Sequence, residues 1–581
     1  PLVGATVQMV NAKGGVTTDE DGYFRIPYSK EGAVRVKVSF VGYQTQTFVL
    51  KADEKKGNQH VLRLQPDATA LDQVVVTATR TPKALKDAPV VTRLITANDI
   101  KIADATNIQD LLTEQMPGLE FGYAMNQETS LNMNGFGGNA VLFLVDGERL
   151  AGETMDNVDY SRLNLDNVGR IEIVKGAASA LYGASAVAGV INIISRENSE
   201  PWTANVNTRY NDFNKEWRHG GSFSFNAGKW NSQTSIQRTT SDEVQLSSPF
   251  DTESNILHIY GGETFNVKER LTYKLSNKVK LIGRGGYFAR ISNRSNYDDH
   301  YKDYSAGLKT VMNLSENDNL EISYGFDQYD KTRFVNNERT HDHDYTNRQN
   351  TVRALYSHIF GKNTLTAGAD FLNDYLTTYQ FANNGSKTQN SYDAFAQFDY
   401  NPLQWLNIVA SLRHDYFSAS SQHATTGRLA LMTKWKGFSI RANYAGGFRA
   451  PTLKEMYMNF DMAGMQMIYG NPDLKPEKSN NYNLALEHTG RVKNAGFLTG
   501  QYSLTLMGYY NKYDKRITTE DYADYTPGTG QPDVASRYCN EDGVEVSGID
   551  FSAQYRSDMG LGVKLDYSYL HVGGRSVDSQ F

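Results

Sequence analysis

The sequence predicts a mainly β protein, in which most of the chain forms an antiparallel barrel that crosses a membrane. From Trp202 onward the chain repeats segments of about 9–14 residues with alternating hydrophobicity, such as 320–329 and 438–448. Tight turns and long polar segments alternate between these strands, as the connections of a membrane barrel do. Tyr (36) and Phe (26) are abundant although the mean hydropathy is −0.54. A soluble all-β protein can share this composition, so the prediction rests on the pattern of strands and connections.

Length and charge exclude several classes of protein. At 581 residues the chain is long enough for several domains. The net charge of −6 and the lack of a Lys/Arg block argue against a nucleic-acid partner. The single Cys539 cannot form an internal disulfide, and Pro1 already looks like the inside of a domain, so we expect a processed start. The eleven His are scattered and no Ser/His/Asp group, P-loop or Cys cluster is present, so we predict neither an enzyme nor a metal site.

The first 80 residues divide into a small domain and a linker. Short alternating strands such as 36–43, broken by turn residues such as 19–22, predict a β-sandwich over residues 1–66. The linker, residues 67–80, holds an isolated β-branched run: Val74, Val75, Val76 and Thr77. Such a run suits an extended peptide that adds to the sheet edge of another protein. The alternative is an ordinary strand of the neighbouring domain.

Residues 81–197 mix helix and strand signals and predict a compact α+β body. We expect helices from Asp99 and over 108–112, and strands over 141–147 and 168–176. The stretch 176–194 is rich in Gly, Ala and Ser, so it predicts packed interior rather than a membrane-spanning helix. Three charged residues are either surface charges or polar contacts to a surrounding wall: Arg170, Glu172 and Lys175.

Two short boxes flank residues 452–470, and an alternating strand precedes the first box. They read Phe448-Arg449-Ala450-Pro451 and Asn471-Pro472-Asp473-Leu474. The pair resembles the FRAP/NPDL signature of TonB-dependent outer-membrane receptors, nearest the Hmu-type haem receptors. The blocks at 141–147, 168–176, 180–183 and 189–194 closely resemble the plug domain of the same family. The run at 74–77 is similar to its energy-coupling TonB box, and residues 1–66 resemble the carboxypeptidase-regulatory-like module.

The resemblance implies a domain order and a location. It implies a β-sandwich over 1–66, a linker with the TonB box over 67–80, a plug over 81–197 and a barrel over 198–581. Barrels of this family have about 22 strands, whereas about seventeen can be counted here, so we expect about five C-terminal strands to be missing. The expected location is the outer membrane of a Gram-negative bacterium. The expected partners are TonB, outer-membrane lipid and a surface haemophore or haemoprotein.

The segment between the boxes suggests the cargo. Haem receptors usually carry a His there, whereas this chain has five methionines: Met456, Met458, Met462, Met465 and Met467. Haem iron accepts a thioether ligand, so Met462 is the first candidate, followed by Met465 and Met467. At the plug apex Tyr123 and Met125 are candidate second contacts. The alternative is a soft apolar patch for cargo or a partner.

The predicted function is TonB-dependent import of haem for iron acquisition, with haem as transported ligand and no catalytic cofactor. The alternatives are a cobalamin or siderophore receptor of the same family, or a passive adhesin barrel. We also expect Arg449, Asp473 and Glu477 to form ion pairs that shape the loop. The segment 330–346, which contains His341 and His343, is expected to be a long solvated loop.

Overall fold

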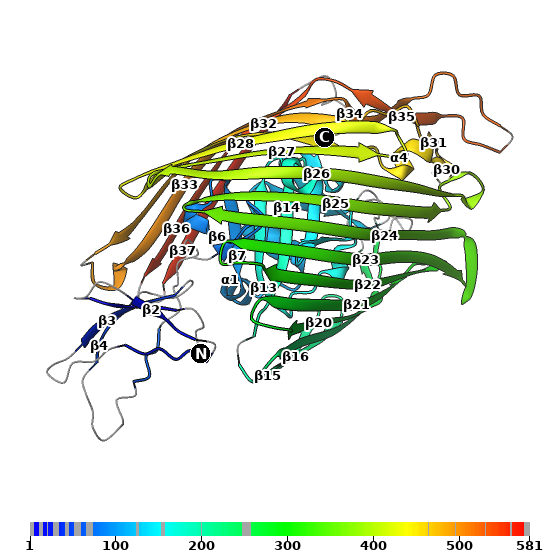
Figure 1. Ribbon diagram of the computed structural model, residues 1–581. Coiled ribbons are helices and arrows are strands. Elements are labelled where there is room, and N and C mark those ends of the chain that lie inside the picture. The colour runs from blue at the N-terminus through cyan, green and yellow to red at the C-terminus, as the bar shows by residue number, and fades with distance from the viewer. Residues whose placement is uncertain are drawn as a thin grey trace. The chain divides into compact units, whose positions relative to one another are not determined.

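The chain forms two compact units, residues 1–88 and 89–581, and each is described by itself. The computed structural model (Figure 1) describes residues 5–10, 15–19, 21–26, 34–40, 46–50, 60–64, 74–123, 127–152, 157–198, 200–246, 257–462, 464–493, 495–528, 530–557 and 561–573.

The first unit contains one antiparallel sheet of four short strands. In sheet order they are β2 (Gly15–Thr17), β1 (Thr6–Met9), β3 (Val34–Ser39) and β4 (Gln46–Leu50). Alternate residues form its core: Val7, Val36, Val38 and Leu50. The second layer of a sandwich is not seen among the described residues of this unit, so the sandwich stays a prediction. Further along, β5 (Val74–Val75) pairs with β6 (Lys83–Ala84), and a 3-10 turn follows at Leu85–Asp87.

The expected α+β body follows, built on two sheets. The larger sheet has the order β12 (Glu148–Arg149), β11 (Val141–Val145), β14 (Gly189–Ser195), β13 (Val168–Lys175) and β7 (Thr92–Thr96). The smaller has the order β10 (Phe136–Gly137), β9 (Thr129–Met133) and β8 (Leu119–Tyr123). Its helices are α1 (Ala97–Ala103), α2 (Ile108–Gln115) and α3 (Ser179–Tyr182). Thr96 and Asp99 form a capping box at the start of α1, which explains why the helix begins there.

The Gly- and Ala-rich stretch lies inside this body, as predicted. Ala180 on α3 is 1% exposed and Ala186 is 0% exposed, and β14 contributes Ile191 to the main core. None of the helices in the described residues has the length and apolar character needed to cross a bilayer.

A lipid-soluble carbene reagent should therefore not label residues 179–194 when the protein sits in a bilayer. Outward-facing side chains of the surrounding strands, such as Leu412 and Leu484 (both 60% exposed), are the internal positive controls. Peptide mapping by mass spectrometry gives both readings from one sample. Labelling at Ala180 or Ala186 as strong as at Leu484 would contradict the interior placement.

The rest of the chain forms one 17-stranded antiparallel sheet that curves around the α+β body, which Figure 1 shows inside it. Its strands, in order, are β15 (Trp202–Asn211), β16 (Glu216–Ala227), β17 (Trp230–Ser241), β20 (Gly262–Lys274), β21 (Val279–Asn293), β22 (Asp298–Asn313), β23 (Asp318–Val335), β24 (Glu338–Phe360), β25 (Asn363–Thr378), β26 (Ser386–Leu403), β27 (Leu406–Phe417), β28 (Gln422–Trp435), β29 (Phe438–Arg449), β32 (Glu477–Val492), β33 (Gly500–Asp514), β36 (Val544–Ser557) and β37 (Gly562–Gly573).

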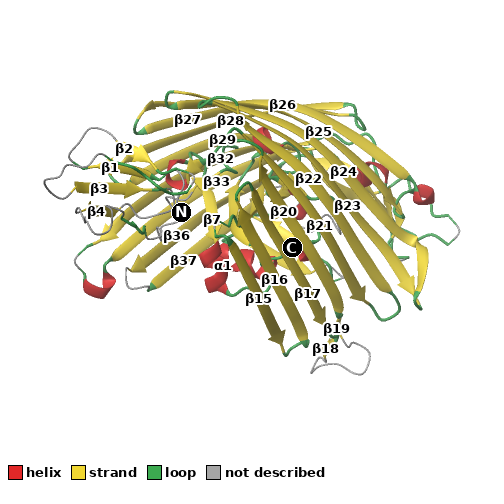
Figure 2. Ribbon diagram, turned by 60° about the horizontal axis from the view of Figure 1, so that its bottom comes forward, coloured by secondary structure: helices red, strands yellow, loops and turns green. Residues whose placement is uncertain are grey.

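The first and last strands of this sheet both contact the helical end of the plug-like body. Arg209 on β15 pairs with Asp104 at the end of α1, and Lys564 on β37 donates to the side chain of Gln115 on α2 (2.7 Å). Figure 2 shows α1 between these two edge strands.

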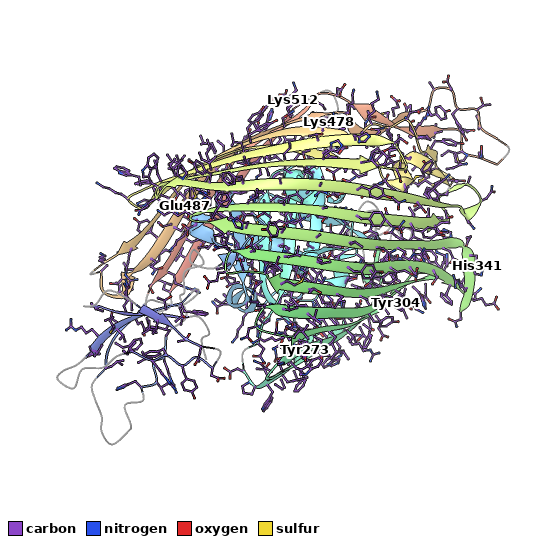
Figure 3. The ribbon with its side chains drawn as sticks, in the orientation of Figure 1. Tyr273, Tyr304, His341, Lys478, Glu487 and Lys512 are labelled. Carbon is purple, nitrogen blue, oxygen red and sulfur yellow. The ribbon has the colours of Figure 1, made fainter. Side chains whose placement is uncertain are left out.

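The outer face of the sheet carries a band of exposed apolar side chains at alternate positions. On β32 and β33 these are Leu484, Leu486, Leu504 and Leu506, each at least 40% exposed. Aromatic side chains such as Tyr304 (42% exposed) lie on the same face (Figure 3). An apolar face bordered by aromatic residues is what lipid contact requires.

The prediction of a long loop over residues 330–346 is wrong. Residues 330–346 form the end of a long β23–β24 hairpin, because Asn336 and Asn337 adopt left-handed conformations (φ 52° and 65°) that suit a two-residue turn. His341 therefore lies on β24, at the opposite end of the sheet from Glu487 (Figure 3). A shorter pair, β18 (Val244–Leu246) and β19 (Leu257–Ile259), forms in the preceding long connection of the same end.

The two longest connections at the His341 end fold together. Loop 450–476 contains α4 (Leu453–Tyr457), β30 (Asn459–Asp461) and β31 (Met467–Tyr469), and loop 515–543 contains β34 (Arg516–Asp521) and β35 (Ala535–Glu541). The strands form one sheet of order β30-β31-β35-β34, in which β31 and β35 are parallel.

Candidate functional site

The plug-like body and the curved sheet meet through buried ion pairs. Arg162, 3% exposed, pairs with Asp303 (2.6 Å) on β22 and Asp327 (2.8 Å) on β23. Lys175 pairs with Asp550 on β36 (2.6 Å), which confirms it as a wall contact. Arg170 instead pairs with Glu172 inside the body (2.7 Å). Buried pairs of this kind fix one orientation of the body, because separating them leaves unpaired charges in a low-dielectric interior.

A second group of contacts holds the upper part of the body. Arg290 on β21 pairs with Asp159 (3.0 Å) and Glu128 (3.1 Å), and stacks on Tyr301 with its guanidinium carbon 4.0 Å from the ring centre. Tyr329 donates to Asp159 (2.7 Å). Burial alone would raise the pKa of Asp159, but Arg290 and the hydrogen bonds outweigh burial and hold this pKa below its ordinary value.

The first box ends a strand and binds the body. Phe448, 1% exposed, packs on Phe417, and its backbone N–H donates to the hydroxyl of Ser179 on α3 (3.2 Å). Arg449 makes a two-pronged bond to Glu477 (2.8 and 2.9 Å) and pairs with Glu455 on α4 (2.8 Å). The expected Arg449–Glu477 pair is thus present.

The second box closes the loop onto its neighbour. The Asn471 side chain donates to the Tyr538 carbonyl (3.0 Å), and its backbone N–H donates to the Glu455 carbonyl (2.8 Å). Leu474 is 1% exposed, whereas Pro472 and Asp473 are exposed, and no ion pair of Asp473 is seen among the described residues. Glu455 therefore holds the position in the Arg449 network that we expected Asp473 to hold.

The five loop methionines separate into two groups. Met456, Met458 and Met467 are 1%, 6% and 4% exposed, and Met456 packs in an aromatic cluster with Tyr301 and Tyr329. Met462 is half-buried and Met465 is 52% exposed; both lie in the turn between β30 and β31, where the Met465 N–H donates to the Met462 carbonyl (3.0 Å). The two methionines that keep some exposure thus sit at the tip of the loop.

One of the two expected apex contacts, Tyr123, lies on the smaller sheet. Tyr123, at the end of β8, is 80% exposed. Met125 lies outside the described residues. Nearby Gln127 accepts from the Tyr260 backbone N–H (3.2 Å) and donates to the His258 carbonyl, which joins the apex to the connection that carries β18 and β19. The described residues hold no group of three or more His, Cys, Asp or Glu arranged for a metal ion.

Cys539, the only cysteine, should alkylate slowly. Burial together with Glu520 and Glu541 raises the pKa of its thiol to about 11. The thiolate is the reactive form, so a raised pKa lowers its population at neutral pH. The rate with iodoacetamide should rise about tenfold per pH unit from pH 7 to 10. A rate at pH 7 equal to that of an unhindered model thiol would contradict this environment.

Comparison with known proteins gives the family. The family model "TonB dependent receptor-like, beta-barrel" matches residues 250–580, more than half of the chain. The chain belongs to the TonB-dependent receptor family. Within this receptor the plug-domain model matches residues 84–190 and the CarboxypepD_reg-like model matches residues 1–76. The family consists of receptors rather than enzymes; its members lie in the outer membrane of Gram-negative bacteria and work with TonB.

Two curated relatives cover most of the receptor. The vitamin B12 transporter BtuB of Photobacterium profundum is 26% identical over 88% of this chain and 81% of its own length. The iron-regulated outer membrane virulence protein of Vibrio cholerae is 24% identical over 88% of this chain and 79% of its own length.

Two solved structures share the fold of this receptor. The siderophore receptor PirA of Pseudomonas aeruginosa has a TM-score of 0.68 at 17% identity, over 83% of this chain and 85% of its own. A double mutant of the hemophore receptor HasR of Serratia marcescens has a TM-score of 0.69 at 13% identity, over 84% of this chain and 82% of its own. It was solved with its hemophore HasA and heme.

One well-connected cation of the barrel wall was not predicted from the sequence. Arg413 on β27 pairs with Asp393 (2.6 Å), Asp415 (3.0 Å) and Asp370 (3.7 Å), and donates to the carbonyl of Leu181 in the plug (3.4 Å). The available signal was a pair of opposite charges, Arg413 and Asp415, two apart in an alternating strand and hence on one face.

Proposed function

We propose that this receptor imports haem across the outer membrane, with energy from TonB acting on residues 73–78. The observation that carries the proposal is the placement of half-buried Met462 and exposed Met465 at the tip of the loop between the two boxes. A thioether can ligate haem iron, and the tip is the part of the loop that a cargo arriving from outside meets first. Tyr123 on the plug apex supplies a second, aromatic contact.

The buried methionines have a different role in this proposal. Met456 packs in the aromatic cluster that contains Leu453 of α4, and Met458 forms a β-bridge with Phe381 of that cluster. Met467 pairs in the loop sheet with Ala535. Met467 could ligate iron only if the loop sheet opened, so Met462 and Met465 are the preferred candidate ligands.

Haem titration of the purified receptor tests the proposal. We expect a Soret shift on binding that is lost or weakened about tenfold in Met462→Ala or Met465→Ala, since one iron bond contributes at least that much affinity. The matched control is Met312→Ala, which removes a methionine at the C-terminal end of β22, away from the loop between the boxes. This variant should bind haem as the wild type does.

The pH dependence separates a thioether from an imidazole. Binding should change little between pH 5 and 7, because a thioether does not titrate there, whereas a His would become protonated and lose the iron. A steep loss below pH 6.5 combined with indifference to both Met substitutions would move the ligand to a His.

A cobalamin or a ferric siderophore is the second candidate cargo, favoured by what the relatives BtuB and PirA are named for. Competition settles the choice: excess cyanocobalamin or ferric enterobactin displaces haem only if the receptor binds it at the same site. A receptor that binds either compound and shows no Soret shift with haem overturns the haem proposal.

A further inference from the structure

Two cavities lie between the plug and one side of the barrel wall. The upper cavity, about 1490 Å³ including its solvent-open part, lies between the plug strand β11 and the wall strands β24 to β27. Its roof is the start of loop 450–476, residues Ala450 to Lys454. The cavity therefore begins directly beneath the loop that carries Met462.

The lower cavity, about 1160 Å³ on the same measure, borders the other side of the same plug hairpin. It is lined by Val168, the first residue of β13, and by Ser195, the last residue of β14, after which the chain leaves the plug toward β15. Two glycines of the wall, Gly286 and Gly307, also line it.

The two cavities share four lining residues: Arg149 and Leu150 of the plug, and Gln349 and Thr351 of β24. The β11–β12 hairpin forms the partition between them, and wall arginines hold its tip. Arg284 donates to the Val145 carbonyl (3.0 Å), and Arg353 donates to the Gly147 carbonyl (3.0 Å). Arg149 therefore stands at the narrow junction of a nearly continuous space beside the plug.

Arg149 differs from the other cations of the upper cavity in its charge balance. Arg353 pairs with Asp370 (2.8 Å), which also lies 3.7 Å from Arg413, and Arg413 has Asp393 and Asp415 as its closer partners. The Arg149 guanidinium donates to the Ala184 carbonyl (2.7 Å), and no described carboxylate forms an ion pair with it. It is half-buried, so it keeps one side toward the cavities.

The surroundings of Arg149 favour an added anion. Burial, and then the positive charges of Arg413 and Arg353, outweigh the opposing effects of Asp374 and Asp370 and lower the pKa of Arg149 to about 10, which still leaves it charged at neutral pH. Asp374 faces the same cavity, but its carboxylate accepts from the amides of Asn347 (2.7 Å) and Gln349 (3.2 Å) rather than from Arg149. A cation that feels nearby carboxylates but forms no ion pair with them, in a partly dry site, gains from an added carboxylate that contacts it directly.

We propose that Arg149, at the junction of the two cavities, is an internal binding site for a carboxylate group of the cargo, separate from the loop methionines. The identity of the ligand as cargo rests on the proposed import function. The existence of an anion site at Arg149 does not depend on it. A haem propionate has the required chemistry, as has a carboxylate siderophore, whereas a cargo whose polar groups are amides does not. Farther along, Lys268 of β20 lines the lower cavity and donates to the Arg162 carbonyl (2.9 Å), so a second cation follows the first.

Thiol labelling of the full-length receptor tests the site without any cargo. The variant Thr351→Cys in a Cys539→Ser background places one thiol at the junction. A sulfonate-bearing methanethiosulfonate and its trimethylammonium analogue then report the local charge. With Arg149 present the anionic reagent should react faster relative to the cationic one by roughly tenfold over the Arg149→Gln variant, and Arg149→Lys should retain the preference. An unchanged ratio in Arg149→Gln, or no reaction with either reagent, overturns the proposal.

Uptake then tests the ligand class. Arg149→Gln should leave the Soret titration unchanged but slow uptake of haem about tenfold, and should have no effect on uptake of haem dimethyl ester, which lacks both carboxylates. Equal slowing for haem and ester contradicts a carboxylate site. If the wild-type receptor imports neither compound, the haem proposal fails, and the labelling ratio still decides whether Arg149 attracts anions.

Discussion

Substituting Pro for Val75 should abolish energised uptake while leaving cargo binding at the loops unchanged. Val75 lies in the run that we assign as the TonB box, and an extended peptide gains its affinity for a sheet edge from main-chain hydrogen bonds. Pro removes one donor and fixes φ, so the added strand cannot form a complete ladder. Uptake by cells that express the variant should fall to the level of cells without TonB, whereas the Kd from the Soret titration should not change.

The matched control is Val75→Ala, which shortens the side chain but keeps the N–H, and it should retain uptake within a few-fold. The structure adds one condition: Val74 and Val75 pair with Lys83 and Ala84, so the box must leave this short hairpin before TonB can hold it. Only two residues pair on each strand, but Val75 and Thr77 are 0% and 1% exposed, so release must also expose buried side chains.

The same variant separates an importer from a passive adhesin. An adhesin needs no coupling peptide, so its surface binding and its physiological effect would both survive Val75→Pro and deletion of residues 73–78. Undiminished uptake in Val75→Pro with TonB present would show that the coupling segment lies elsewhere.

The barrel and plug could be predicted because their signals are local. Alternation of apolar and polar residues records which face of a strand meets lipid, so β23 and β29 were recognisable from sequence alone. This alternation stops where the strands extend beyond the part of the barrel that contacts lipid. Residues 330–346 are polar on both faces because the hairpin rises beyond the apolar band, and the pattern could not distinguish a polar strand from a loop.

The site was less predictable, since burial in a loop depends on contacts far away in sequence. The five loop methionines look equivalent in sequence, yet Met456 is buried by Tyr301 and Tyr329, and Met467 by pairing with Ala535. The cavities beside Arg149 arise where a plug hairpin meets β24, and no local pattern encodes such a junction. Only the capping box Thr452–Glu455 gave a local sign that α4 begins after the first box.

Replacing Arg449 by Met should release loop 450–476 from the barrel. The side chain of Arg449 is 2% exposed, and those of Glu455 and Glu477 are 4% and 9% exposed. Removing the cation leaves two carboxylates facing each other in a dry site, which costs about 3–5 kcal/mol. Glu477 also accepts from the backbone N–H of Ile517 (2.6 Å), so loop 515–543 should loosen with it. Hydrogen exchange of the amides in α4 and β34 measures the effect.

Two variants show whether the charge or the volume of Arg449 matters. Neutralising both carboxylates in Arg449→Met/Glu455→Gln/Glu477→Gln should restore much of the protection, because the repulsion disappears while the amides can still accept hydrogen bonds. Lys515→Met removes a cation from an exposed pair with Asp542 at the same end of the barrel, and should change exchange little. Haem affinity should follow the exchange rates, since Met462 and Met465 lie in the same loop as α4, which the Arg449–Glu455 pair ties to the barrel. Fast exchange in α4 with unchanged haem affinity would show that the loop tip binds cargo without the order that Arg449 imposes.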